Sequence, residues 1–355
     1  MGTLSRRQLL GATAASAAGL IMQPAWRTLA TAPEPQKITP ELLAAAKKEG
    51  RVAFYTSVEL PVAEKVAKAF EAKFPGIAVR VERSGAERNF QRIAQEYASR
   101  IFACDVVQSS DAAHFIAWKR EGLLASYLPE EVAAHYPAQH RDAEGMFASW
   151  RIYLSVIAYN TKLVSKEEAP RSFADLLDPK WVGKLVKAHP GYSGTIMTAT
   201  QQMVATLGWS YFEKLAKQKV MQLQSAADPP KKVAIGERAV QVDGADYSIL
   251  QLQDRGEPVE IVYASEGSPL ITGPAALMQG APHPNAARLF YSWAMGSECQ
   301  QLIVDAAGLR SAHALVRERT GRKPLDQIKL MREDPVAVEA GSDAIKARYS
   351  ALFGV

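Results

Sequence analysis

Small hydroxyl-bearing residues and a glycine follow three successive short apolar runs near the start of the chain. They are Thr56, Ser57, Ser84, Gly85, Ser109 and Ser110. Backbone N–H groups and serine hydroxyls at helix N-termini suit an anion, because the positive end of the helix dipole assists them. Serine and threonine are also good helix caps, which explains any one of these turns alone. Their recurrence predicts an anion site.

A fourth turn of the same kind begins a helix in the middle of the chain. It contains Ser193, Gly194 and Thr195, after Pro190-Gly191-Tyr192. We expect these residues to donate hydrogen bonds to the same anion, together with the three earlier turns. Such turns at the carboxyl ends of strands are where open α/β sheets bind ligands.

Other residues are candidates for the remainder of the ligand. Tyr153 and Tyr247 would wall the cleft or hydrogen-bond the ligand, and Asp243 or Asp246 would pair with an ammonium group if the ligand is zwitterionic. Arg83 and Arg151 are candidate charge partners, although arginine at a surface is usually solvated.

The elements that position these turns alternate between short apolar runs and amphipathic segments, which is typical of an α/β protein. In the first part, strands are expected at 52–55, 77–81 and 105–107, with helices after each. Consecutive strand–turn–helix units imply right-handed crossovers and a parallel sheet. In the second part, strands are expected at 151–159, 184–188, 240–247 and 259–263, and the last third is helical.

The first thirty-two residues predict export. An arginine pair, Arg6-Arg7, precedes an uncharged small and apolar run, and Ala30-Thr31-Ala32 offers a small-x-small cleavage site. This pattern is typical of a twin-arginine signal peptide. The apolar run is shorter than the roughly 20 residues that cross a bilayer, although a retained membrane anchor is an alternative. We expect a periplasmic protein.

Composition excludes some classes of function. The leader contains Arg6, Arg7 and Arg27 and no acidic residue, so its removal lowers the formal net charge from +5 to +2. No basic block or stripe remains, and nucleic-acid binding is therefore not expected. The length exceeds what one core usually serves, which predicts two domains. Cys104 and Cys299 are either one disulfide or two buried thiols.

Enzymatic chemistry finds little support. Gly191-Tyr192-Ser193-Gly194-Thr195 is similar to a nucleophile elbow, but Thr195 stands where the second glycine belongs. The six histidines lack zinc spacing, and no phosphate loop or dinucleotide motif is present. We expect no catalytic residue, no cofactor and no resident metal, with an exported hydrolase as a remote alternative.

Longer segments carry a resemblance to a known family. They include 42–52, 70–79, 103–107, 121–124, 175–184 and 280–290, among them Phe74-Pro75-Gly76-Ile77 and Asp178-Pro179-Lys180-Trp181. Together they resemble periplasmic solute-binding proteins of the ferric-iron-type branch of ABC importers, over nearly the whole mature chain.

This resemblance implies a two-lobed periplasmic-binding-protein fold of type II, with the ligand in a cleft between α/β lobes. It implies a first lobe of residues 38–150 plus 263–355 and a second lobe of residues 151–262. Closure of the lobes on the ligand and delivery to an inner-membrane permease are the expected mechanism, and the protein is expected to be a monomer.

The iron ligands of that branch are largely missing. Thr56-Ser57-Val58-Glu59 contains no counterpart of the family's histidine, Ser110 stands where the glutamate is expected, and the tyrosine pair aligns with Tyr247-Ser248. Ferric ion prefers several anionic oxygens, so one tyrosine is a poor match. We therefore expect a small organic anion, such as a phosphonate, a sugar phosphate or a carboxylate, with ferric iron bound through Tyr247 as the alternative.

Overall fold

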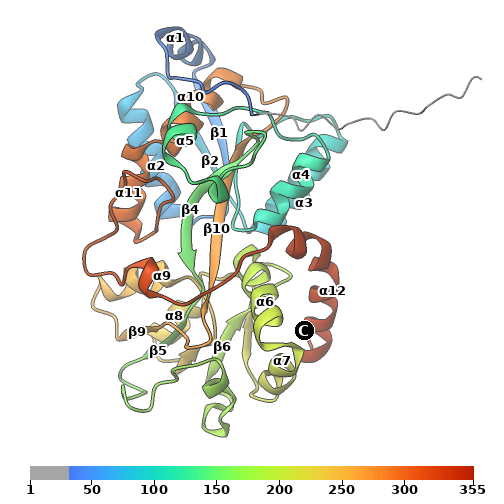
Figure 1. Cartoon of the computed structure of the whole chain (residues 1–355), viewed down its shortest axis with the longest axis vertical. Coiled ribbons are helices and arrows are strands. Elements are labelled where there is room, and N and C mark those ends of the chain that lie inside the picture. The colour runs from blue at the N-terminus through green and yellow to red at the C-terminus, as the bar shows by residue number, and fades with distance from the viewer. Residues whose placement is uncertain (1–31) are drawn as a thin grey trace, which may run out of the picture. The chain divides into compact units, whose positions relative to one another are not determined.

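Two β-sheets organise the chain in the computed structural model, which describes residues 32–355 (Figure 1). The first sheet has the order β11-β10-β3-β1-β2, and β4 pairs with β10. Its strands are β1 (Arg51–Thr56), β2 (Ala78–Arg83), β3 (Val106–Gln108), β4 (Ala148–Leu154), β10 (Ser268–Leu277) and β11 (Leu330–Met331). β1 is parallel to both β2 and β3, which confirms the parallel core of this sheet, whereas β10 is antiparallel to β3 and β4.

Helices cover the first sheet and define a first lobe. They are α1 (Pro40–Glu49), α2 (Leu60–Lys73), α3 (Ala86–Ala98), α4 (Ala112–Arg120), α5 (Glu130–His135), α10 (Pro284–Met295) and α11 (Ser297–Ala307). Every fourth residue of α2 from Val62 to Phe70 is buried, as an amphipathic helix requires. Phe70 contacts Phe290 and Trp293 of α10 edge-on, at centroid distances of 5.1 and 5.5 Å. The lobe's core thus joins segments distant in sequence.

The second sheet has the order β7-β6-β8-β5-β9 and defines a second lobe. Its strands are β5 (Ile157–Asn160), β6 (Leu185–Ala188), β7 (Met221–Leu223), β8 (Val240–Gln241) and β9 (Val259–Val262). Its helices are α6 (Gly194–Leu207), α7 (Trp209–Ala216), α8 (Pro229–Ala234) and α9 (Asp246–Gln253). A core that includes Phe173, Trp181 and Phe212 fills this lobe.

Two adjacent strands carry the chain between the lobes. β4 pairs with β10 from Ala148 to Leu154 and is followed at once by β5, and β9 leads directly into β10. Figure 1 shows β4 and β10 side by side, running from the helices of the first lobe toward β5 and β6. The predicted single strand over 151–159 is therefore wrong: Ser155 and Val156 separate two strands that belong to different sheets.

The C-terminal helix α12 (Pro335–Phe353) lies across the two lobes. Its residue Tyr349 belongs to the core of the second lobe, whereas Glu339 pairs with Arg120 of α4 at 2.7 Å. The sequence-based division placed all of 263–355 in the first lobe, and α12 departs from it because its apolar face packs on α6 and α7 as well as α4. The lobe boundaries otherwise stay a prediction.

Other expectations can be compared directly. The chain after Ser172 forms a short 3₁₀ turn (Ala174–Leu177), and β10 and α12 were not predicted as elements. Cys104 and Cys299 are separate buried thiols rather than a disulfide.

In the part of the chain that the structure describes, no helix is both long and apolar enough to cross a membrane. The predicted leader lies outside the described residues, except Ala32.

Candidate functional site

A cavity of about 390 Å³ lies between elements of both lobes, at the carboxyl ends of β1, β2, β3 and β6. Six of the predicted ligand-binding residues line it: Ser57, Gly85, Ser110, Ser193, Thr195 and Tyr247. Three arginines, Arg83, Arg88 and Arg151, line it too. Residues from four separate turns thus meet in one place, as expected for a ligand site at the carboxyl ends of the strands of an α/β protein.

Arg151 is the most deeply buried charge of the cavity wall, with only 1% of its surface exposed. It projects from β4, and its guanidinium donates to the hydroxyl oxygens of Tyr247 at 3.2 Å and Ser57 at 3.3 Å. Glycine at position 273 of the neighbouring strand β10 makes room for it, since a Cβ there would lie 2.8 Å from Arg151 Cγ. The backbone of two paired strands thus holds this cation in place.

The charge of Arg151 has no carboxylate within ion-pair distance among the described residues. The other buried cations of this part of the chain each have one: Lys187 pairs with Asp243, Arg310 with Glu318 and Arg322 with Asp246. Burial of an unpaired charge is strongly unfavourable. Arg151 therefore faces the cavity without a direct ion-pair partner, and the Glu59 carboxylate acts on it only from beyond the Tyr247 hydroxyl.

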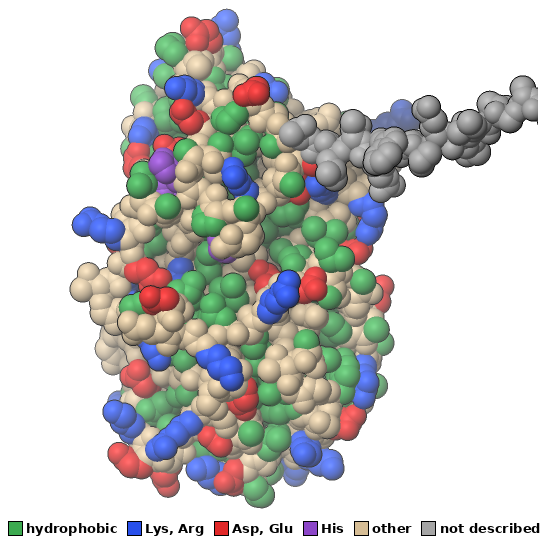
Figure 2. Space-filling model, viewed as in Figure 1, with side chains coloured by type: hydrophobic (Ala, Val, Ile, Leu, Met, Phe, Trp, Pro, Cys, Tyr) green, Lys and Arg blue, Asp and Glu red, His purple; other side chains and the backbone are tan. Residues whose placement is uncertain are grey.

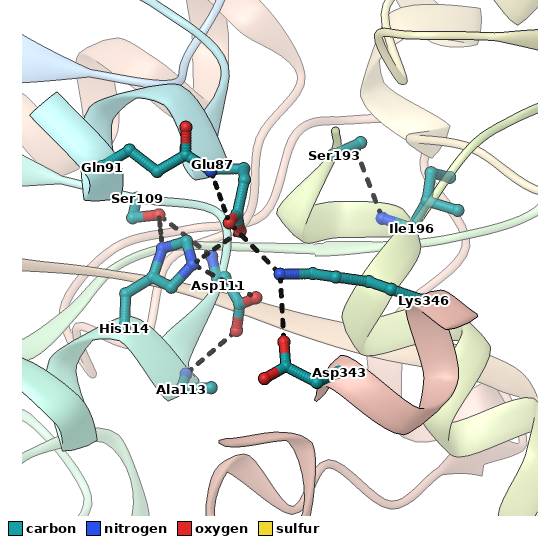
Figure 3. Close-up of polar contacts among 10 residues, drawn as sticks. All are labelled: Glu87, Gln91, Ser109, Asp111, Ala113, His114, Ser193, Ile196, Asp343 and Lys346. Carbon is teal, nitrogen blue, oxygen red and sulfur yellow. Dashed lines mark hydrogen bonds and ion pairs between the residues drawn. The ribbon is translucent and has the colours of Figure 1, made fainter. Parts of the chain in front are cut away.

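Hydroxyl groups surround this charge. Ser193 Oγ accepts a hydrogen bond from the N–H of Ile196, which caps α6 and leaves the serine O–H free to donate (Figure 3). Thr195 Oγ1 lies 2.7 Å from the hydroxyl of Tyr153, which lies behind the cavity wall. The guanidinium of Arg151 also stacks over the Tyr153 ring at 5.0 Å. The two tyrosines, Tyr153 and Tyr247, meet edge-on at 5.2 Å.

Three of the backbone donors that the sequence suggested are engaged within the protein. The N–H groups of Ser57, Ser84 and Ser109 donate to the carbonyl oxygens of Gln108, Thr56 and Pro274 respectively. These N–H groups are already used in hydrogen bonds between neighbouring strands, because the strand pairing continues for one residue beyond each strand end. Side-chain hydroxyls and guanidinium groups, rather than these three amides, are the donors that face the cavity.

Tyr247 links the two lobes through its hydroxyl. It donates to Glu59 Oε2 at 2.5 Å, and Ser248 Oγ donates to Glu59 Oε1 at 3.1 Å. Glu59 precedes α2 in the first lobe, whereas Tyr247 and Ser248 belong to α9 in the second lobe. Burial raises the pKa of Tyr247 well above its usual range, and the Glu59 carboxylate raises it further. The tyrosine is thus a neutral hydrogen-bond donor.

Gly194 brings the lobes into close contact. A Cβ at this position would lie 2.7 Å from Asp111 Cβ and 2.9 Å from Ala86 Cβ, both in the first lobe. Gly194 itself does not line the cavity, so the prediction that it binds ligand is not supported by its position. Its role in the structure is steric, because only a residue without a side chain fits this approach.

A charged cluster forms the wall beside α3 (Figure 3). Glu87 of α3 lies 3.6 Å from His114 Nε2 of α4 and 3.2 Å from Lys346 Nζ of α12. Burial alone would raise the pKa of Glu87, but the hydrogen bonds and charges of His114 and Lys346 outweigh it and lower the pKa to about 2. Glu87 lines the cavity with its charge compensated.

Five more predicted site residues lie away from the cavity surface. Thr56 is fully buried and donates to Gln108 Oε1, Ser109 Oγ contacts His114 Nδ1 at 3.3 Å, and Ser84 does not reach the lining. Asp243 lies inside the second lobe, where it pairs with Lys187 at 2.5 Å and both side chains are fully buried. The predicted role of Asp243 at the ligand therefore conflicts with its position. Asp246 is likewise engaged, by Arg322.

Sequence reasoning missed Glu87, Arg88 and Gln91 as wall residues, and also the segment 224–228. That segment follows β7, a three-residue strand that was not predicted. If β7 had been predicted, the position of segment 224–228 at its carboxyl end would have indicated that the segment lines the cavity. The sequence did indicate that a buried carboxylate such as Asp243 has a structural role, because a lysine within the apolar strand Leu185–Ala188, Lys187, requires a buried carboxylate partner.

The described residues contain no group of three or more histidine, cysteine, aspartate or glutamate side chains that could hold a metal ion. The face seen in Figure 2 intersperses lysine and arginine with acidic side chains, without a block of one sign.

Comparison with known proteins decides the family. A family model for bacterial extracellular solute-binding proteins matches residues 56–301. The chain belongs to this family. Its members are the non-enzymatic, extracytoplasmic solute-binding components of ABC importers, which confirms the expectation of a binding protein rather than an enzyme. The resemblance found in the sequence is confirmed with it.

Curated relatives are distant. An uncharacterised protein of Haemophilus influenzae is 26% identical over 275 residues, covering 72% of this chain and 76% of that protein. A probable ABC transporter periplasmic-binding protein of Sinorhizobium fredii, y4fP, is 23% identical over 234 residues, covering 63% of this chain and 64% of the relative.

Solved structures confirm the two-lobed fold. The periplasmic binding protein AfuA from Actinobacillus pleuropneumoniae, with fructose-6-phosphate bound, is similar with a TM-score of 0.79 at 23% identity, covering 86% of this chain and 99% of AfuA. Iron-bound HitA from Pseudomonas aeruginosa has a TM-score of 0.74 at 22% identity, covering 84% and 99% of the two chains. One of these proteins carries a sugar phosphate and the other iron, so the fold alone does not select the ligand.

Proposed function

We propose that this solute-binding protein captures a small organic anion, such as a phosphonate, a sugar phosphate or a carboxylate, in the cavity around Arg151. Delivery to a membrane permease of an ABC importer would follow, in the periplasm, after export through the leader of residues 1–32. The observation that carries the proposal is the buried, unpaired guanidinium of Arg151 facing a cavity of about 390 Å³. An anion would supply the missing negative charge.

The surrounding groups favour the same chemistry. Ser57, Ser110, Ser193 and Thr195 line the cavity with hydroxyls, and Arg83 and Arg88 add positive charge at its exposed side. Hydrogen bonds to charged groups contribute about 1.5–3 kcal/mol each. A bound anion that contacts both lobes would stabilise the closed arrangement, as expected for hinge closure around a ligand.

The iron alternative finds less support in the cavity. Tyr247 accepts from Arg151 and donates to Glu59, and its raised pKa opposes the phenolate that ferric ion requires. A cation would also be repelled by the unpaired guanidinium. Hard ferric ion prefers several anionic oxygens. Three carboxylates line the cavity, but Glu87 contacts His114 and Lys346, Asp228 pairs with Lys231, and Glu59 accepts from Tyr247.

A thermal-shift screen of the purified protein tests the proposal. Phosphonates, sugar phosphates, carboxylates and Fe(III) would be compared for wild type and for Arg151→Met. We expect at least one anion to raise the melting temperature of wild type, and the shift to disappear in the variant, because ligand binding stabilises by mass action. A coloured ferric complex, or equal shifts in both proteins, would refute the anion site at Arg151.

A further inference from the structure

Glu59 is an unexpected residue in a cavity that otherwise suits an anion. Its carboxylate lines the same wall as Arg151, and only the hydroxyl of Tyr247 separates the two charged groups. Arg151 donates to this hydroxyl at 3.2 Å, and the hydroxyl donates to Glu59 at 2.5 Å. A positive and a negative group are thus fixed side by side at the ligand.

The charge of Glu59 is not neutralised as that of its neighbour Glu87 is. Glu87 contacts His114 and Lys346, whereas Glu59 has no cationic side chain within ion-pair distance in the described part of the chain. It accepts one hydrogen bond from Tyr247 and one from Ser248. An ionised carboxylate has about four acceptor sites, so acceptor capacity remains for a ligand.

We propose that Glu59 is the specificity-determining residue of this site, and that it selects anions carrying a hydrogen-bond donor, a hydroxyl or an ammonium group, close to the anionic group. This inference rests on the proposed function. The anionic group would face Arg151 and the hydroxyls, while the donor would reach Glu59. A second negative charge in place of the donor would be repelled by Glu59. An apolar group in the same place would remove water from the Glu59 carboxylate without supplying a hydrogen bond to its remaining acceptor sites.

A purely structural role for Glu59 is the competing explanation, because its two hydrogen bonds join α2 of one lobe to α9 of the other. Such a latch would favour the closed state for every ligand equally. Its loss would weaken all ligands by a common factor and leave their order unchanged. The ratio of affinities between ligands therefore separates the two roles.

Four phosphonates of similar size provide the test: 2-aminoethylphosphonate, 2-hydroxyethylphosphonate, ethylphosphonate and phosphonoacetate. Their affinities would be measured by calorimetry for wild type, Glu59→Gln and the matched control Glu64→Gln, which removes an exposed carboxylate from α2, the helix that Glu59 precedes. We expect wild type to bind the first two at least about 10-fold more tightly than ethylphosphonate, as loss of a charge-assisted hydrogen bond predicts.

In Glu59→Gln, the preference for the ammonium compound should fall by about 10-fold, because the amide oxygen accepts a hydrogen bond but carries no charge. The preference for the hydroxyl compound should fall less, and phosphonoacetate should gain affinity. The relative size of the first two affinities in wild type identifies which donor the site prefers. Glu64→Gln should match wild type in every ratio.

Ratios that are unchanged in Glu59→Gln would overturn the inference and leave Glu59 as a latch, with the anion site intact. If wild type binds none of the four while a larger anion from the thermal-shift screen does bind, the requirement for a donor next to the anionic group is wrong. If no anion binds at all, the proposed function fails as well. The two failures are thereby distinguished.

Discussion

Two buried cations of the same chain have opposite surroundings. Lys187 on β6 is fully buried inside the second lobe and pairs with Asp243 at 2.5 Å. Arg151 on β4 is buried to a similar degree, but its guanidinium donates only to hydroxyl oxygens, and it faces a cavity. Because an unpaired buried charge is costly, a protein keeps one only where something else compensates it. The difference separates a structural cation from one available to a ligand.

The largest expected effect concerns the structural cation. Lys187→Met would leave the Asp243 carboxylate buried without a partner, and the free energy of unfolding should fall by about 3–5 kcal/mol. Burial lowers the pKa of Lys187 and raises that of Asp243, and the charge of each partner opposes the shift without cancelling it. Urea denaturation measures the change.

The double variant Lys187→Met/Asp243→Leu is the control for this pair. It removes both charges, and stability should return close to that of wild type, since replacing a buried ion pair by apolar residues is often neutral. A double variant as unstable as Lys187→Met would show that the pair contributes more than mutual neutralisation. Anion affinity of the double variant should equal that of wild type, because neither residue lines the cavity.

For Arg151, the cation that faces the ligand, we expect a small effect on stability and a large effect on anion affinity. Arg151→Met should leave the free energy of unfolding without ligand within about 1 kcal/mol of wild type, because it removes an unpaired buried charge. Its anion affinity should fall by about 10- to 150-fold, the equivalent of 1.5–3 kcal/mol. Denaturation without ligand and calorimetry with the best anion of the screen measure the two quantities. A large loss of stability with unchanged affinity would assign Arg151 to the structural class.

The sequence predicted much of this arrangement and failed in identifiable places. Strand ends with Ser57, Ser110 and Ser193 could be located because apolar runs and helix caps leave local signals. The contrast between Arg151 and Lys187 could not be predicted, since ion pairing depends on which strands become neighbours. Asp243 was assigned to the ligand for that reason: its partner on β6 lies 56 residues away in the chain.

Long-range contacts explain the other errors as well. The run 151–159 is mostly apolar and buried throughout, so no local pattern reveals that the chain passes from one sheet to the other at Ser155. The hydrogen bonds of Glu59 could not be predicted, because its partners, Tyr247 and Ser248, belong to the opposite lobe. Residues whose role depends on the meeting of two lobes are thus the part of the site that local reasoning cannot supply.

A smaller effect tests how firmly Arg151 is held. In Gly273→Ala, the new Cβ would lie 2.8 Å from Arg151 Cγ and 2.9 Å from its Nε, so the side chain must shift. Overpacking of this kind costs about 1–3 kcal/mol of stability, and a displaced guanidinium should weaken anion binding as well. Gly183→Ala, in a turn with no heavy atom within 4 Å of the added Cβ, controls for loss of a glycine. The φ of 74° at position 183 makes this substitution destabilising, but the anion affinity of the variant should remain that of wild type.

The smallest effect concerns Glu87, a carboxylate of the cavity wall whose charge, unlike that of Arg151, is fully compensated. Its pKa is about 2 in the folded protein, below its ordinary value of 4.5, so the unfolded chain binds more protons between these values. The stability contributed by ionised Glu87 is present above about pH 4.5 and is lost as the pH falls toward 2. The slope from this one group is at most about 1.4 kcal/mol per pH unit, reduced by its partial exposure. Glu87→Gln should therefore flatten the acid limb of the curve of stability against pH, measured by denaturation from pH 6 to 3. An unchanged acid limb would mean that His114 and Lys346 do not stabilise the ionised carboxylate, and the distinction between compensated and uncompensated charges in this cavity would lose its basis.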